Sequence, residues 1–116
     1  MENTEKAAIS RLHAEFCKTL SDANRLLIIS ELSGGEVSVN ELARRLELRQ
    51  SNVSKHLALM RERGLVMTRR EGATIYYSLT DPRISQAIHL LRAVQADQIE
   101  KQRVLAHGIP EFSTSK

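Results

Sequence analysis

The stretch VNELARRLELRQSNVSKHLALMRERGLV, residues 39–66, decides the fold because it holds two helical patterns only a few residues apart. In each pattern apolar side chains recur at steps of three or four residues, which is the spacing of one helix face. The two patterns, joined by a short turn at 47–49, predict a helix-turn-helix over residues 38–63. The apolar residues that form the patterns are Leu42, Leu46, Val53, Leu57 and Met60.

The second helix of this pair begins with small polar residues instead of apolar ones. Ser51, Asn52 and Ser54 are poor formers of helix interiors because their side chains compete for backbone hydrogen bonds. Lys55 and His56 follow them directly. A helix that only packs against a core does not need such a face, so we expect its first turns to meet an external polar surface.

Basic residues concentrate around this helix. Residues 44–70 hold eight bases and two acids, a charge of +6, whereas the other nine bases and twelve acids of the chain give −3, for a net charge of +3. A basic segment in an otherwise mildly acidic chain is typical of a protein that binds a polyanion. The alternative interpretation is a solvated charged face without a partner.

Further helices flank this pair. Helical spacing predicts a first helix over 3–20 and a last helix over 82–105, and another helix that begins at Ser21 or Asp22. The first and last helices have apolar stripes beyond what a small core needs, which predicts that they form the interface of a homodimer. The stripes are Ile9, Leu12 and Phe16 in the first helix, and Ile84, Ile88, Leu91 and Val94 in the last.

After Gly64 the spacing changes from helical to alternating. Two strand-like runs within 65–79, separated by a turn at Gly72, predict a β-hairpin. The predicted fold class is therefore mainly α with a small β-hairpin: a winged helix-turn-helix with extra N- and C-terminal dimerisation helices. We expect one domain over 1–107 and a flexible tail at 108–116.

This order of elements predicts how the protein meets double-stranded DNA. The major groove admits one α-helix whose early residues touch base edges, so the helix over 50–63 is the expected reader. Lys55 and His56 would reach phosphates, and the hairpin would lie beside the adjacent backbone or minor groove. The predicted DNA-binding residues are Arg49, Gln50, Ser51, Asn52, Ser54, Lys55, His56, Arg69, Arg70 and Thr74.

Three stretches together resemble the ArsR/SmtB family of bacterial repressors in order and spacing: LSDANRLLIISEL, VNELARRLELRQSNVSKHLALMRERGLV and REGATIYYSLTD. The resemblance extends over roughly residues 12–95. It implies a homodimer built from the first and last helices, which binds a palindromic operator and releases it when an inducer binds. The chain departs from the usual family pattern with Arg49 before the reading helix, and with Ala73 and Thr74 at the wing tip.

The metal-binding residues of that family are absent from the matching positions. Metal-sensing relatives carry Cys-Val-Cys where this chain has Ser38-Val39-Asn40, and Asp81 is not followed by the expected histidine. Arsenite and cadmium need clustered thiolates, and zinc needs at least three protein ligands. We therefore predict no metal and no cofactor, and no release from DNA by zinc, cadmium or arsenite.

His13 and Cys17 are the one local pair with sensor chemistry. They are four residues apart, so a helix would place them on one face. Nitrogen and sulfur ligands suit zinc or copper, and an accessible thiolate reacts with oxidants. A lone cysteine in an apolar helix is, however, most often a small buried hydrophobe. All three interpretations stay open at this stage.

Several classes of protein do not fit the sequence. A single cysteine excludes an intramolecular disulfide, and the longest apolar run is far too short for a membrane span. No secretory signal is predicted, so we expect a cytoplasmic protein. The sequence has no Gly-rich phosphate loop and no nucleophile–base set, so we expect no enzyme. The competing function is a winged-helix module that uses the same surface for protein contacts without binding an operator.

Overall fold

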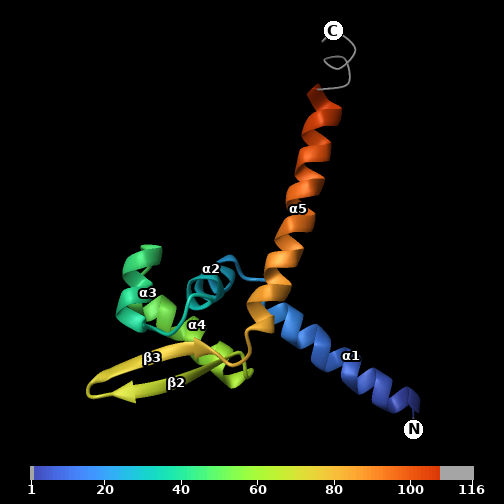
Figure 1. Cartoon of the computed structure of the whole chain (residues 1–116). Coiled ribbons are helices and arrows are strands. Elements are labelled where there is room, and N and C mark those ends of the chain that lie inside the picture. The colour runs from blue at the N-terminus through green and yellow to red at the C-terminus, as the bar shows by residue number, and fades with distance from the viewer. Residues whose placement is uncertain (1, 108–116) are drawn as a thin grey trace. The chain divides into compact units, whose positions relative to one another are not determined.

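The computed structural model describes residues 2–107, so the tail predicted at 108–116 lies outside the described residues. The chain divides into two compact units, Met1–Ser85 and Gln86–Lys116. The prediction of a single domain over 1–107 stays a prediction. The elements, labelled in Figure 1, are α1 (Glu2–Thr19), α2 (Ala23–Leu32), β1 (Val37–Ser38), α3 (Val39–Leu46), α4 (Gln50–Glu62), β2 (Val66–Glu71), β3 (Thr74–Leu79) and α5 (Arg83–His107).

The structure confirms the predicted fold class, and the helices begin and end within two residues of the predicted bounds. Local capping explains two of the starts. The Asp22 carboxylate accepts hydrogen bonds from the backbone N–H groups of Asn24 and Arg25, at 2.8 and 3.2 Å. The Ser38 hydroxyl accepts one from the N–H of Glu41 at 3.2 Å. Each cap of this kind stabilises its helix by about 1 kcal/mol.

Helices α2, α3 and α4 supply most of the core of the first unit. In α4 the apolar residues of the helical pattern, Val53, Leu57 and Met60, are completely buried, as their spacing predicts. Leu46 belongs to the apolar pattern of the predicted helix, which implies burial. It is only half-buried, because it is the last residue of α3 and the chain turns away there. The fully buried side chains are Ile28, Ile29, Leu42, Val53, Leu57, Met60 and Leu65.

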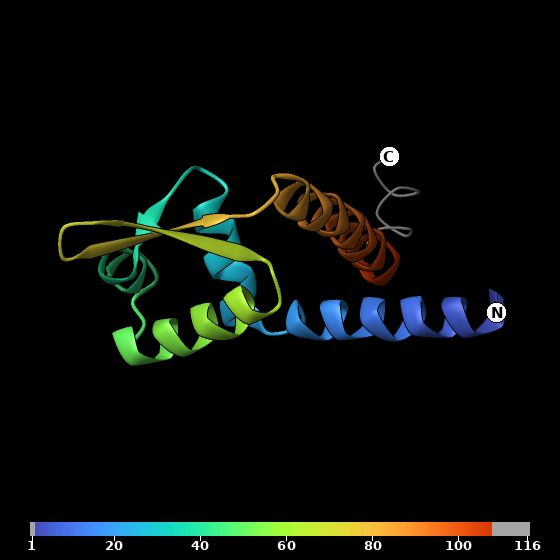
Figure 2. The ribbon, with the colours of Figure 1, turned by 90° about the horizontal axis from the view of Figure 1, so that it is seen from below.

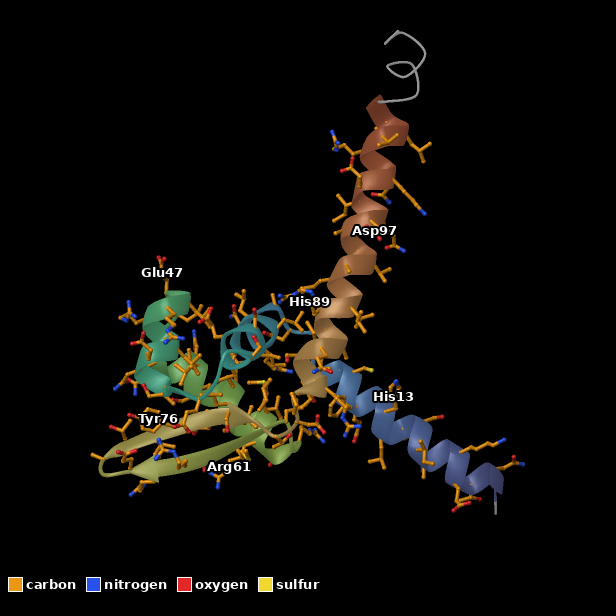
Figure 3. All side chains as sticks on the ribbon, viewed as in Figure 1. His13, Glu47, Arg61, Tyr76, His89 and Asp97 are labelled. Atoms are coloured by element: carbon orange, nitrogen blue, oxygen red, sulfur yellow. The ribbon has the colours of Figure 1, made fainter. Side chains whose placement is uncertain are left out.

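The turn between α3 and α4 depends on Glu47, labelled in Figure 3. Its φ of 55° is in the left-handed region, and among residues 2–107 no other non-glycine has a positive φ. This conformation lets the N–H of Leu48 donate to the carbonyl of Ala43 at 3.0 Å, which ends α3. At the end of α4, Gly64 has a φ of 80° and the chain turns into β2 in the same way.

The hairpin is part of a small antiparallel sheet with strand order β1-β3-β2. The turn between β2 and β3 contains Gly72 with a φ of 63°, as predicted from the sequence. The tip of the hairpin lies at the same end of the first unit as the start of α4 (Figure 2). Strand β1 shows no signal in the sequence, because the two residues Val37–Ser38 are too few to show alternation.

Candidate DNA-binding surface

Helix α4 has one buried side and one polar, exposed side. Val53, Leu57 and Met60 are 0% exposed and form its buried side. The side chains on the first turns that point elsewhere are exposed, and we call them the reading face. The reading face consists of Gln50, Ser51, Asn52, Ser54 and Lys55. The structure therefore gathers five of the ten predicted DNA-binding residues on one exposed surface.

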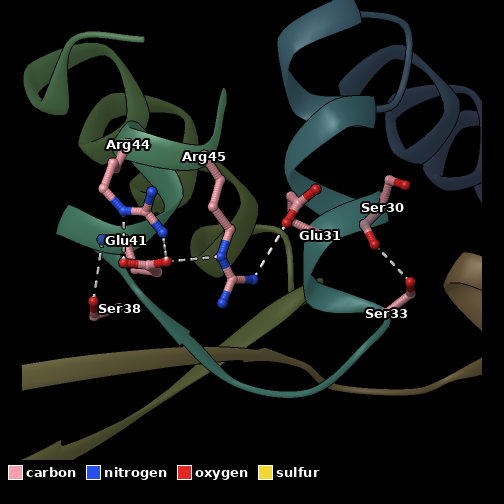
Figure 4. A network of polar contacts seen from close by, with 7 residues as sticks. All are labelled: Ser30, Glu31, Ser33, Ser38, Glu41, Arg44 and Arg45. Atoms are coloured by element: carbon pink, nitrogen blue, oxygen red, sulfur yellow. Dashed lines mark hydrogen bonds and ion pairs between the residues drawn. The ribbon is translucent and has the colours of Figure 1, made fainter. Parts of the chain in front are cut away.

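The arginines of α3 form ion pairs with acids of α2 and α3 at the surface. Glu41 accepts hydrogen bonds from Arg44 and from Arg45, and the Nη1 of Arg45 also donates to Glu31 at 3.3 Å (Figure 4). The Arg44 and Arg45 guanidiniums lower the pKa of Glu41 to about 2. A cation that is already paired with a carboxylate attracts a phosphate less strongly, because part of its charge is neutralised.

The wing contains one paired and one unpaired arginine. Arg69 donates to Glu36 at 3.1 Å and to Glu71 at 2.7 Å, and its guanidinium lies 4.9 Å from the ring centre of Tyr76, which Figure 3 labels. These hydrogen bonds raise the pKa of Arg69, and the one from Arg69 lowers the pKa of Glu36. Arg69, a predicted DNA contact, thus connects the wing to the segment before β1. The side chain of Arg70 is exposed and has no ion-pair partner among residues 2–107.

Four of the eight bases in 44–70 have no ion-pair partner in the part of the chain that the structure describes. Two of these bases, Arg49 and Lys55, flank or belong to the reading face, and Arg61 lies further along α4 (Figure 3). Arg63 is held loosely, 3.7 Å from Glu15. The unpaired bases are Arg49, Lys55, Arg61 and Arg70.

The start of α4 lacks a side-chain cap. Arg49 occupies the capping position with a φ of −67°, and its side chain accepts no hydrogen bond from the first turn. An arginine has no acceptor, whereas the serine that begins α3 has one. The positive end of the α4 dipole therefore has no side-chain oxygen to offset it, which favours an external anion at this end.

A groove of about 290 Å³ lies between the reading face and the wing. Its lining carries no charged side chain and brings together three of the predicted DNA-binding residues: Thr74 of the wing, and Gln50 and Ser54 of α4. It also includes Asn40 and Tyr77, which are not among the predicted DNA-binding residues. Helical spacing cannot identify such residues, because they come from α3 and β3 and meet α4 only in the folded chain. The full lining is Ser38, Val39, Asn40, Gln50, Ser54, Ala73, Thr74, Ile75 and Tyr77.

The structure does not place His56 on the reading face. Its side chain is half-buried on the side of α4 that faces α2, where the Nε of Arg25 donates to its Nδ1 at 3.2 Å. Its Nε2 lies 3.9 Å from the Oδ1 of Asp22. His56 thus does not fit the prediction that it reaches phosphates, because its ring is directed towards another helix.

The possible sensor pair lies on α1, away from these residues in the sequence. The Sγ of Cys17 is 3.6 Å from the Nε2 of His13, and both side chains are exposed in the single chain. Cys17 is therefore not a buried core residue of the monomer. Within residues 2–107, the structure shows no group of three or more His, Cys, Asp and Glu side chains placed to hold a metal ion. In the same range, no helix combines the length and apolar character that crossing a bilayer requires.

A helix-turn-helix with a polar, exposed second helix beside a β-hairpin is the architecture of winged helix-turn-helix DNA-binding proteins. Residues 22–68 match the family described as bacterial regulatory protein, arsR family. The chain is 39% identical over 99 residues to the transcriptional activator HlyU of Vibrio cholerae, covering 84% of this chain and 86% of that protein. The chain belongs to the ArsR family of bacterial regulatory proteins, as the resemblance implies, and is a DNA-binding transcriptional regulator.

Two further relatives extend the comparison. The biofilm growth-associated repressor of Agrobacterium fabrum is 40% identical over 77 residues, 66% of either chain. The solution structure of a homodimeric winged helix-turn-helix DNA-binding domain from Mycobacterium bovis matches with a TM-score of 0.75 and 29% identity. That match covers 83% of this chain and 89% of the other. The named relatives are transcriptional regulators and not enzymes, and they include both an activator and a repressor.

Proposed function

We propose that this chain is a homodimeric repressor that binds a palindromic operator through the reading face and the wing, in the bacterial cytoplasm where the DNA lies. The observation that carries the proposal is the division of α4 into two sides. Its inner side is fully buried in the core, and its outer side is polar, exposed and accompanied by cations that have no ion-pair partner among residues 2–107. A helix held so firmly on one side can present the other to a DNA groove with fixed geometry.

The residues divide into three roles in this proposal. Gln50 and Ser54 reach base edges in the major groove, because their amide and hydroxyl groups can both donate and accept hydrogen bonds. Arg49 and Lys55 bind phosphates, which contributes affinity without sequence information. Arg70 and Thr74 contact the backbone beside the wing, and Arg69 holds the wing in place through Glu36.

The dimer proposal depends on apolar residues that the single chain leaves exposed. On α1, Ile9 is 65% and Leu12 67% exposed, and on α5, Leu91 is 64% and Val94 53% exposed. Apolar patches of this kind usually mark an interface. A two-fold dimer presents two reading faces related by symmetry, which suits a palindromic operator. The Mycobacterium bovis relative is described as homodimeric, which supports the same assembly here.

Operator binding is tested with a duplex selected from a random DNA library. Fluorescence anisotropy should show that Gln50→Ala costs about 1–3 kcal/mol of binding free energy and relaxes preference at one base pair. Gln86→Ala, which removes an exposed glutamine from α5, is the matched control and should bind like the wild type. Selection of no duplex at all would contradict the proposal and favour the protein-interaction module.

The dimer is tested separately by sedimentation velocity. Leu91→Glu should give monomers with poor operator binding, because it places a charge in the proposed apolar interface. Ala93→Glu adds the same charge two residues later, on the opposite side of α5, and should leave a dimer. A wild-type protein that sediments as a monomer at micromolar concentration would overturn the proposed assembly.

A further inference from the structure

Arg25 connects three elements of the first unit through one guanidinium group. Its Nη1 donates to the carbonyl oxygen of Thr19 at the end of α1, at 2.7 Å. Its Nε donates to Nδ1 of His56 on α4, at 3.2 Å. Thr19 is only 4% exposed, and His56 is half-buried. The end of α1 and the middle of α4 are therefore joined by a partly buried polar link that runs through a residue of α2.

The contact with His56 is specific to one state of the imidazole ring. Since Nδ1 accepts a hydrogen bond from Arg25, it carries no proton, and the ring proton sits on Nε2. That nitrogen lies on the side of Asp22, 3.9 Å from its Oδ1. Asp22 in turn caps α2 through the N–H groups of Asn24 and Arg25. The start of α2 thus supplies both the arginine that hydrogen-bonds His56 and a carboxylate on the other side of the ring.

Little apolar packing supports this region. Between the end of α1, the start of α2 and the second half of α4 lies a pocket of about 380 Å³. Leu59 is the only large apolar side chain of its lining, and the other side chains are polar or charged, among them Lys18 and Arg63. The polar link therefore adds a restraint on α4 at His56, on the flank of the buried side that Val53 and Met60 form.

His56 is adjacent to the reading face in sequence. It follows Lys55 directly and lies one helical turn after Asn52, so a rotation of α4 that released His56 would also move these two side chains. Contacts to base edges require side chains to be placed within a fraction of an ångström. A restraint at His56 therefore acts on the geometry of the reading face without touching DNA.

We propose that Arg25 is a positioning residue for DNA recognition: it holds α4 through His56 and ties its orientation to the end of α1. This inference rests on the proposed function, because it assumes that the reading face binds the operator. Since α1 is also a proposed dimer helix, the link connects the dimer interface to the helix that reads DNA. Arg25 therefore contributes to operator affinity through the position of α4, although its guanidinium makes no contact with DNA.

The test measures operator affinity, its salt dependence and the thermal unfolding of matched variants. Arg25→Met and His56→Leu should each weaken operator binding about tenfold, and the double variant should be no weaker than either single variant. His56→Asn places an acceptor oxygen close to the position of Nδ1 and should restore most of the affinity. The slope of log affinity against log salt should stay at the wild-type value, because no phosphate contact is lost.

Besides unchanged operator affinity in Arg25→Met, three results would overturn the proposal. A salt slope that falls by about one in His56→Leu would show that His56 binds a phosphate. Additive losses in the double variant would show that the two residues act independently. Equal losses in His56→Asn and His56→Leu, at equal melting temperature, would show that the acceptor atom does not matter.

Failure of this inference is distinguishable from failure of the proposed function. Gln50→Ala in the same assay reports on the reading face itself. If Gln50→Ala weakens binding and Arg25→Met does not, only the positioning role is wrong. If neither changes binding, the reading face is wrong as well. Amide hydrogen exchange gives an independent measurement. Loss of the link should speed exchange in the first turns of α4, while the amides of the buried core stay protected.

Discussion

Helices α3 and α4 are alike on their inner sides and different on their outer sides. Leu42 of α3 and Leu57 of α4 are both 0% exposed. On the outer side of α3, Arg44 and Arg45 are bonded to acids, whereas Lys55 on α4 has no ion-pair partner among the described residues. Two neighbouring basic helices in one motif thus offer very different surfaces to a polyanion.

This difference shows that a count of basic residues overstates the number of cations available to bind a phosphate. The segment 44–70 has a charge of +6, yet four of its eight bases form ion pairs with acids, and all of these acids lie outside the segment. Glu31 and Glu36, for example, each neutralise an arginine of the basic segment. The surface that a phosphate meets is therefore concentrated on α4 and the wing, and α3 contributes mainly neutral side chains such as Asn40.

The largest expected effect tests the similarity of the two inner sides. Leu42→Ala and Leu57→Ala should each cost about 2–5 kcal/mol of unfolding free energy, because each leaves a cavity in the same core. Urea unfolding followed by circular dichroism measures both. If either substitution lowered the unfolding free energy by less than about 1 kcal/mol, that helix would not pack as described.

A smaller effect tests the two helix starts. Ser38→Ala should destabilise the protein by about 1 kcal/mol, because it removes the side-chain cap of α3. Arg49→Ser should do the opposite and stabilise it by about 0.5–1 kcal/mol, because α4 has no such cap. The same Arg49→Ser variant should bind DNA more weakly.

Thermal unfolding and anisotropy on the two variants check both statements. If Arg49→Ser is more stable and binds DNA more weakly, then Arg49 contributes to phosphate binding and lowers the stability of α4 by leaving it without a side-chain cap. If Arg49→Ser bound DNA as tightly as the wild type, Arg49 would have to be removed from the interface.

Most of the fold was predictable, because it depends on local signals. Alternating and helical spacings fix the elements, and Asp22, Ser38 and Gly72 fix where several of them begin or turn. The strand β1 was not predictable, since its two residues pair with Tyr76 and Tyr77, far away in the sequence.

The position of the site was predictable, but the ion pairs that its basic residues form were only partly so. The bond of Arg45 to Glu41 could have been found, because four residues separate them on a helix. The bond of Arg69 to Glu36 could not, because it joins segments that meet only in the sheet. The partial burial of His56 could have been predicted from its position. It lies three residues after Val53 and four before Met60, on the flank of the buried side, but as a basic residue type it suggested a phosphate contact.

The smallest expected effect concerns the acid dependence of the α3 network. Hydrogen bonds from Arg44 and then Arg45 lower the pKa of Glu41 from 4.5 to about 2. Because the folded pKa is depressed, the stabilisation is complete above pH 4.5 and is lost as the pH falls through about 2. The urea midpoints of the wild type and Glu41→Gln should therefore differ at pH 5 and converge towards pH 2. A constant gap over this range would show that the network does not titrate.

The most direct test of the central claim compares one unpaired with one paired cation. Lys55→Ala and Arg44→Ala each remove one positive charge from the helix-turn-helix, and their DNA affinities are measured on the same duplex from low to moderate salt. If α4 binds phosphates and α3 does not, Lys55→Ala lowers the slope of log affinity against log salt by about one, and Arg44→Ala leaves it unchanged. Equal slopes for the two variants, or a larger loss with Arg44→Ala, would contradict the assignment of the reading face.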